Sequence, residues 1–161
     1  SLLAATRGYL RGAAQSETRR LLHVHALLET LAEDALEAGQ QVNVSGQAAP
    51  LLALPGALRR CVGNLLDNAI QYGQRADIHV EDSAEQLVIE ISDHGPGIPE
   101  NRIHSVFEPF VRLEESRNRH SGGAGLGLSI ALELARQHGG QLTLLNRPEG
   151  GLLARLVLPR K

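Results

Sequence analysis

The chain has 161 residues and a mass of 17.3 kDa, which is the size of one domain with a core of its own. With 42% hydrophobic residues, 21% charged residues and a formal net charge of −2, its composition is that of an ordinary soluble globular chain. This balance gives no electrostatic reason to expect nucleic acid as a partner. The single cysteine, Cys61, excludes an internal disulfide, and the only lysine, Lys161, excludes a phosphate-binding loop that ends in Gly-Lys-Ser/Thr.

Hydrophobic periodicity and turn residues predict the secondary structure in chain order. Apolar residues at helical spacing indicate helices, and alternation of apolar with polar residues indicates half-buried strands. Pro55 suits the first turn of a helix, while Gly39 and Gly73 are placed where a glycine ends one. The predicted elements are helices over 24–38, 55–73 and 125–137 and strands over 41–45, 51–54, 76–82, 86–92, 141–146 and 152–158.

These elements predict an α/β fold with two layers, in which about three helices pack on a mixed sheet of about five strands. The two short strands 41–45 and 51–54 are expected to pair with each other. Residues 93–124 are rich in glycine, proline and charge and have little regular structure. So long a segment inside a compact domain is usually a functional loop or lid.

The predicted helix 55–73 has two different faces. At about 100° per residue, Leu58, Val62, Leu65 and Ala69 share one side, whereas Asn64, Asn68 and Gln71 share the other. A row of carboxamides can be a solvated face. It can also supply neutral oxygen ligands to a metal-bound phosphate, which would offset the poor helix propensity of asparagine.

Two glycine-containing segments follow this helix. In Asp93-His94-Gly95-Pro96-Gly97, a carboxylate at a strand end precedes glycines that let the backbone approach a ligand, although such a turn can be purely structural. Residues 122–129, Gly-Gly-Ala-Gly-Leu-Gly-Leu-Ser, open a helix and suit either an anion site or a hinge. Phe107 and Phe110 lie between the two segments and would anchor the lid.

The order of these motifs resembles the N, G1, F and G2 boxes of the histidine kinase catalytic and ATP-binding domain, from about Leu21 to Pro159. The resemblance implies the Bergerat α/β sandwich, which Hsp90, MutL and type II topoisomerase ATPases share. It also implies ATP and Mg²⁺ as cofactors and a protein-histidine kinase activity that passes the γ-phosphate of ATP to a histidine. The ATPase relatives carry a basic glutamate at the position of Asn64. An amide cannot take a proton, which fits a domain that does not hydrolyse ATP with water.

The resemblance assigns a role to each site residue. Asn64 would be the catalytic position, Asn68 the Mg²⁺ ligand, and Asp93 the residue that reads the adenine amino group. The other nucleotide-binding residues implied are Gln71, Tyr72, Gly95, Gly97, Ile98, Arg112, Gly123, Ala124, Gly125, Leu126, Gly127 and Leu128. Gln71 departs from the family, which usually has lysine or arginine there, and we therefore expect a weaker nucleotide affinity.

The same resemblance implies a domain organisation. Residues 1–20 would be a remnant of a dimerisation helix and its linker, and residues 21–161 the ATP-binding catalytic domain, with the ATP lid at about 98–124. None of the seven histidines has the context of a phosphoacceptor, and the chain contains no methionine. We therefore expect a piece of a longer protein that binds ATP without phosphorylating itself.

The expected partners are the protein's own dimerisation and phosphoacceptor domain and a downstream response regulator, with no nucleic acid. The fragment is expected to be monomeric and cytoplasmic, and its parent a homodimer anchored in the inner or plasma membrane. One alternative is a degenerate nucleotide-binding regulatory module that never transfers phosphate. Another is a Bergerat-fold ATPase, which Asn64 disfavours.

Overall fold

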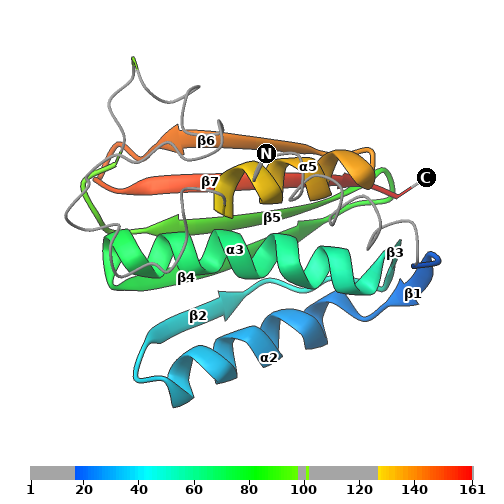
Figure 1. The fold of residues 1–161 in the computed structure, drawn as a ribbon, viewed down its shortest axis with the longest axis horizontal. Helices are drawn as coiled ribbons and strands as arrows, with labels where there is room; N and C mark the ends of the chain where they lie inside the picture. The colour runs from blue at the N-terminus through cyan, green and yellow to red at the C-terminus, as the bar shows by residue number, and fades with distance from the viewer. Residues whose placement is uncertain (1–16, 98–100, 102–126, 161) are drawn as a thin grey trace, which may run out of the picture.

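The computed structural model describes residues 17–97, 101 and 127–160. Within them the chain forms three helices and seven strands (Figure 1). In chain order these are β1 (Arg20–Leu22), α2 (Val24–Glu37), β2 (Gln41–Ser45), β3 (Leu51–Ala53), α3 (Pro55–Gly73), β4 (Arg75–Asp82), β5 (Gln86–Asp93), α5 (Gly127–Gln137), β6 (Gln141–Asn146) and β7 (Leu152–Pro159).

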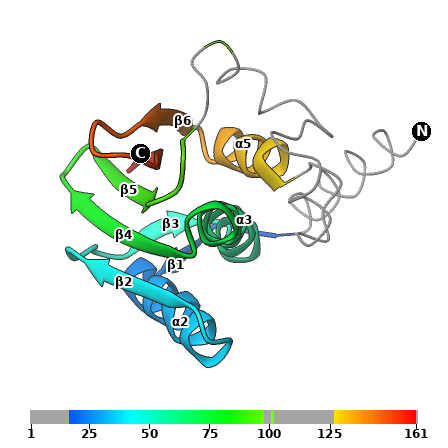
Figure 2. The same ribbon diagram turned by 90° about the vertical axis from the view of Figure 1, so that its left-hand side faces the viewer.

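Five strands form one mixed sheet in the order β2-β4-β5-β7-β6, in which only β2 and β4 are parallel. All three helices lie on one face of this sheet, as the view along the strands makes plain (Figure 2). The predicted two-layer α/β sandwich is therefore confirmed. None of the three described helices is long and apolar enough to cross a bilayer.

The expected pairing of strand 41–45 with strand 51–54 is wrong. β2 pairs with β4, whereas β3 pairs with β1 in a separate two-stranded sheet. Gly46, the residue after β2, has φ +85° and lies against the backbone of β4, where an added Cβ would stand 2.1 Å from the carbonyl oxygen of Val80. β1 was not predicted.

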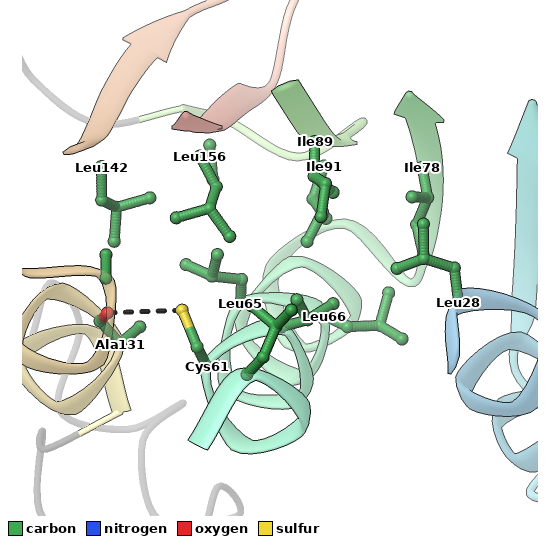
Figure 3. Close-up of a cluster of buried hydrophobic side chains, with 14 of the residues drawn as sticks. Leu28, Cys61, Leu65, Leu66, Ile78, Ile89, Ile91, Ala131, Leu142 and Leu156 are labelled. Carbon is green, nitrogen blue, oxygen red and sulfur yellow. Dashed lines mark hydrogen bonds between the residues drawn. The ribbon is translucent and has the colours of Figure 1, made fainter. Parts of the chain in front are cut away.

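The core fills the space between the helices and the sheet (Figure 3). The apolar face of α3 is buried as predicted, because Leu58, Val62, Leu65 and Ala69 are each at most 4% exposed. The Cys61 thiol donates a hydrogen bond to the carbonyl of Ala131, 3.4 Å away, and so joins α3 to α5. Burial raises the pKa of this thiol to about 12.

The segment before β1 attaches to the ends of two helices. The residue that caps α3, Leu54, makes no side-chain hydrogen bond to the first turn. The Glu17 carboxylate supplies that cap instead, accepting the N–H groups of Gly56 at 2.6 Å and Ala57 at 2.9 Å. Arg19 donates to the carbonyl of Gln137 at 3.0 Å, at the end of α5. Both charges oppose the local helix dipole and so favour this attachment.

Candidate functional site

The polar face of α3 carries the first part of the site. Asn64, Asn68 and Gln71 are half-buried on the side opposite the core, as the sequence predicts. Beside Asn68, burial raises the pKa of Asp67 above its ordinary value. The side chain of Tyr72 lies outside what the structure describes. This face therefore presents amide oxygens, which are ligands that Mg²⁺ accepts without any change of protonation.

Asp93 forms the second part of the site, at the end of β5. It is 2% exposed, and its Oδ1 accepts the N–H groups of Gly95 at 2.9 Å and Leu152 at 3.0 Å. Its main-chain carbonyl accepts a hydrogen bond from Nη1 of Arg147 at 2.7 Å. Both of these N–H groups bond to Oδ1, and neither of them bonds to Oδ2. A carboxylate held in this way is pre-oriented toward a donor on a ligand.

The end of α3 lies directly against this turn. A Cβ added at Gly73 would stand 2.7 Å from Cβ of Asp93 and 2.7 Å from the backbone nitrogen of His94. The helix ends at Gly73 as predicted, but the left-handed conformation falls to the next residue, Gln74, at φ 66°. Gly73 is needed instead for close packing, and it brings the amide helix and the Asp93 turn together.

The turn between β6 and β7 supports Asp93 from the other side. Gly151, at φ +94°, has no room for a side chain, since an added Cβ would lie 2.1 Å from the carbonyl oxygen of Asp93. Gly97, at φ +78°, packs against the side chain of Asn146. Sequence reasoning treated residues 147–151 only as a connection between strands. The paired glycines after Arg-Pro-Glu were the one signal in the sequence that the turn fits tightly against something.

His94 lies beside the site on the exposed side of the turn. Its Nε2 is 2.9 Å from Oδ2 of Asp77, and Asn43 donates to Oδ1 of the same carboxylate at 3.2 Å. Burial acts to raise the pKa of Asp77, but these two hydrogen bonds and the charges of His94 and Arg75 outweigh it and hold the pKa below its ordinary value. The prediction that His94 faces solvent agrees with the structure.

Only the end of the glycine-rich motif is described. Gly127 is the first residue of α5, and Leu128 packs partly on the core. The helix runs antiparallel beside α3 (Figure 1). The other predicted site residues of this region, which are Ile98, Arg112, Gly123, Ala124, Gly125 and Leu126, lie outside the described residues.

A sequence model of the histidine kinase-, DNA gyrase B- and HSP90-like ATPases matches residues 53–161. The chain belongs to this family. The sensor histidine kinase GtrS of Pseudomonas aeruginosa is 48% identical over 138 residues, which are 85% of this chain and 28% of that protein. The chain therefore spans less than a third of that relative.

Solved structures agree with the family. The mycobacterial sensor histidine kinase MprB superposes with a TM-score of 0.76 at 25% identity, covering 88% of this chain and 97% of that one. The ATP-binding domain of PrrB from Mycobacterium tuberculosis gives a TM-score of 0.71 at 30% identity, covering 90% of this chain and 99% of that one. The predicted kind of domain, a histidine kinase ATP-binding domain with a Bergerat sandwich, is confirmed.

Proposed function

We propose that this chain is the catalytic part of a two-component sensor histidine kinase, which gives the γ-phosphate of ATP to a histidine on a dimerisation domain outside the chain. The observation that carries the proposal is the contact between Gly73 and Asp93. It places a buried, fixed carboxylate at the end of the helix that bears Asn64 and Asn68. In this arrangement the carboxylate can bind a base and the amide face of the helix can meet phosphates.

Asp93 would recognise the base. Adenine has an exocyclic amino group, and a carboxylate is the natural acceptor for it. Because Oδ1 is already engaged by Gly95 and Leu152, Oδ2 would take that hydrogen bond. Gly95 and Gly97 would let the base lie close to the backbone, with Ile98 and Tyr72 along its edges.

The amide face of α3 would meet the phosphates. ATP supplies the transferable phosphoryl group, and Mg²⁺ neutralises its charge. The donor set fits Mg²⁺, because Asn68 offers one neutral oxygen and the ion takes its remaining ligands from phosphates and water. Asn64 would orient the reacting group, and because an amide does not accept a proton at neutral pH it would not activate water.

The start of α5 would hold the phosphate tail. Backbone N–H groups at a helix N-terminus bind anions, and Gly127 and Leu128 form that terminus here. By family resemblance, Gly123, Ala124, Gly125 and Leu126 extend the clamp, and Arg112 adds positive charge. Gln71 is neutral where the family is usually basic, so we expect Gln71→Arg to tighten ATP binding.

Partners and location follow from the kinase proposal. The chain would act on its own dimerisation and phosphoacceptor domain and feed a response regulator, in a homodimeric parent anchored in the inner or plasma membrane, with this part in the cytoplasm. Residues 1–20 would join the two domains. Glu17 and Arg19, at the end of this segment, contact α3 and α5 of the catalytic domain.

Calorimetric titration with ATP and ADP, with and without Mg²⁺, tests the site. We expect one saturable site that Asp93→Ala abolishes. The matched control Asp34→Asn, on the exposed face of α2, should bind as the unchanged chain does. Thermal unfolding of each variant checks that it is folded. Absence of binding by the folded chain would contradict the proposal and indicate a degenerate nucleotide site.

Phosphotransfer needs a second measurement. The chain is mixed with a matching dimerisation domain and radiolabelled ATP, and acid-labile phosphohistidine is expected on the added domain. Asn68→Ala should lose this transfer. Binding without transfer would again favour the regulatory module, whereas steady release of phosphate without any acceptor would indicate an ATPase.

A further inference from the structure

The β6–β7 turn contacts Asp93 at three points. Arg147 donates from Nη1 to the Asp93 carbonyl at 2.7 Å, Leu152 donates its N–H to Oδ1 at 3.0 Å, and Gly151 packs against the same carbonyl. The turn is also closed on itself, because the N–H of Arg147 bonds to the carbonyl of Gly151 at 2.9 Å and that of Gly150 to the carbonyl of Arg147 at 3.0 Å. These two bonds fix the shape of the turn that carries Arg147.

These contacts replace the regular pairing of β5 with β7. The paired register of the two strands ends at Ser92 and Leu153. One residue further, the amide of Leu152 bonds to the side chain of Asp93, and the Asp93 carbonyl turns to Arg147. At this end of the sheet, the Asp93 carboxylate therefore accepts the N–H of Leu152, and the Arg147 guanidinium donates to the main-chain carbonyl of Asp93.

The hydrogen bond of Arg147 to the Asp93 carbonyl is a stronger interaction than its ion pair with Glu149. Its Nε is 3.8 Å from Oε1 of Glu149, but the Glu149 side chain is 67% exposed whereas that of Arg147 is 20% exposed. An ion pair so long and so open to water contributes little. A short bond from a largely buried guanidinium to a carbonyl is charge-assisted and contributes more.

We propose that Arg147 is a positioning residue for base recognition, which fixes the backbone of Asp93 so that its carboxylate meets the amino group of adenine. The inference rests on the proposed ATP site. Without this bond the carbonyl of Asp93 can rotate, and the orientation of the carboxylate is then set by Leu152 and Gly95 alone. Recognition of the amino group becomes less favourable because part of the orientation must be achieved on binding.

Affinities for ATP and for inosine triphosphate test the proposal, because inosine carries a carbonyl oxygen where adenine carries the amino group. Titrations are made well below the melting temperature of each variant. We expect Arg147→Gln to weaken ATP binding about tenfold while inosine triphosphate binding changes little, so that the preference for ATP falls. Arg147→Lys, which keeps a charged donor, should recover most of that preference. Glu149→Gln is the matched control and should leave it unchanged.

Other outcomes separate the two proposals. If Arg147→Gln lowers the melting temperature but leaves the ratio of the two affinities unchanged, Arg147 only stabilises the end of the sheet, and the positioning role is wrong. An equal loss for both nucleotides also overturns it, since that indicates general distortion. If the unchanged chain has no preference for ATP, or Asp93→Ala leaves the preference intact, the base-reading role of Asp93 fails and the inference fails with it.

Discussion

His138 is a buried histidine that connects the end of α5 to the start of α3. Its Nδ1 donates to the carbonyl of Leu134 at 2.8 Å, and its Nε2 accepts the N–H of Leu54 at 3.1 Å. These two bonds require the neutral ring with its proton on Nδ1. Burial lowers the pKa of His138 below its ordinary value of 6.5, because the charged ring would lose water, and the positive charge of Arg19 acts in the same direction.

This histidine predicts a loss of stability on mild acidification. Since the unfolded state takes up the proton at a higher pH than the folded state, the contribution of His138 is complete above about pH 6.5 and declines as the pH falls below it. One proton limits the slope to about 1.4 kcal/mol per pH unit. We expect urea unfolding between pH 7 and pH 5 to give a flatter profile for His138→Gln. The exposed His23→Gln is the control, and equal slopes in all three proteins would contradict the assignment.

At the scale of elements, the N-terminus of α3 depends on a residue 39 positions earlier in the chain. A helix leaves its first N–H groups without partners inside the helix, and the residues around Pro55 provide no side-chain acceptor. Glu17 accepts two of these groups and adds a negative charge at the positive end of the dipole. The same two hydrogen bonds of Glu17 therefore attach the segment before β1 and cap the start of α3, the longest described helix.

Glu17→Gln tests this feature, because the amide keeps one acceptor oxygen but loses the charge and the second acceptor. We expect the free energy of unfolding to fall by about 1 kcal/mol, in the range of other lost helix caps. Urea titration followed by circular dichroism measures it. The exposed Glu33→Gln on α2 is the matched control. An unfolding midpoint equal to that of the control would mean that the cap contributes nothing to stability.

At the scale of the whole molecule, local pattern predicted the elements but not all of their partners. The helices and the strands of the large sheet follow from periodicity, because each buries one face against a shared core. The partner of β2 does not, since alternation tells which face is buried and not which strand lies beside it. The contact of Gly46 with Val80 accompanies this pairing, and it too joins residues far apart in the chain.

The candidate site divides in the same way. The chemistry of Asn68 and Asp93 is visible in the sequence, because amides on one helix face and a carboxylate before glycines are unusual local choices. Arg147 is not visible as a partner of Asp93, because 54 residues separate the two and an arginine in a turn has no local signal of its own. Residues with a local chemical pattern are thus predicted more readily than the distant residues that contact them.

Arg160, the last residue that the structure describes, connects several segments far from the site. Nε and Nη2 of Arg160 contact Oδ1 of Asp82 at 2.8 Å and 2.7 Å, and its other bonds reach the carbonyls of Pro50 at 2.9 Å and Ala49 at 3.1 Å. The other oxygen of Asp82 accepts the N–H of Ala49 at 2.8 Å. One guanidinium thus joins the end of β7, the β4–β5 turn and the loop before β3.

We expect Arg160→Ala to lower the free energy of unfolding by about 2 kcal/mol, because several charge-assisted bonds are lost together and the loop carbonyls lose their donor. Arg155→Ala, which removes a single 3.7 Å contact with Glu90, should cost no more than about 0.5 kcal/mol. Asp82→Ala combined with Arg160→Ala should cost less than the sum of the two single changes, because the two side chains share their bonds. Strict additivity in urea unfolding would show that the arginine acts on the loop carbonyls without its carboxylate.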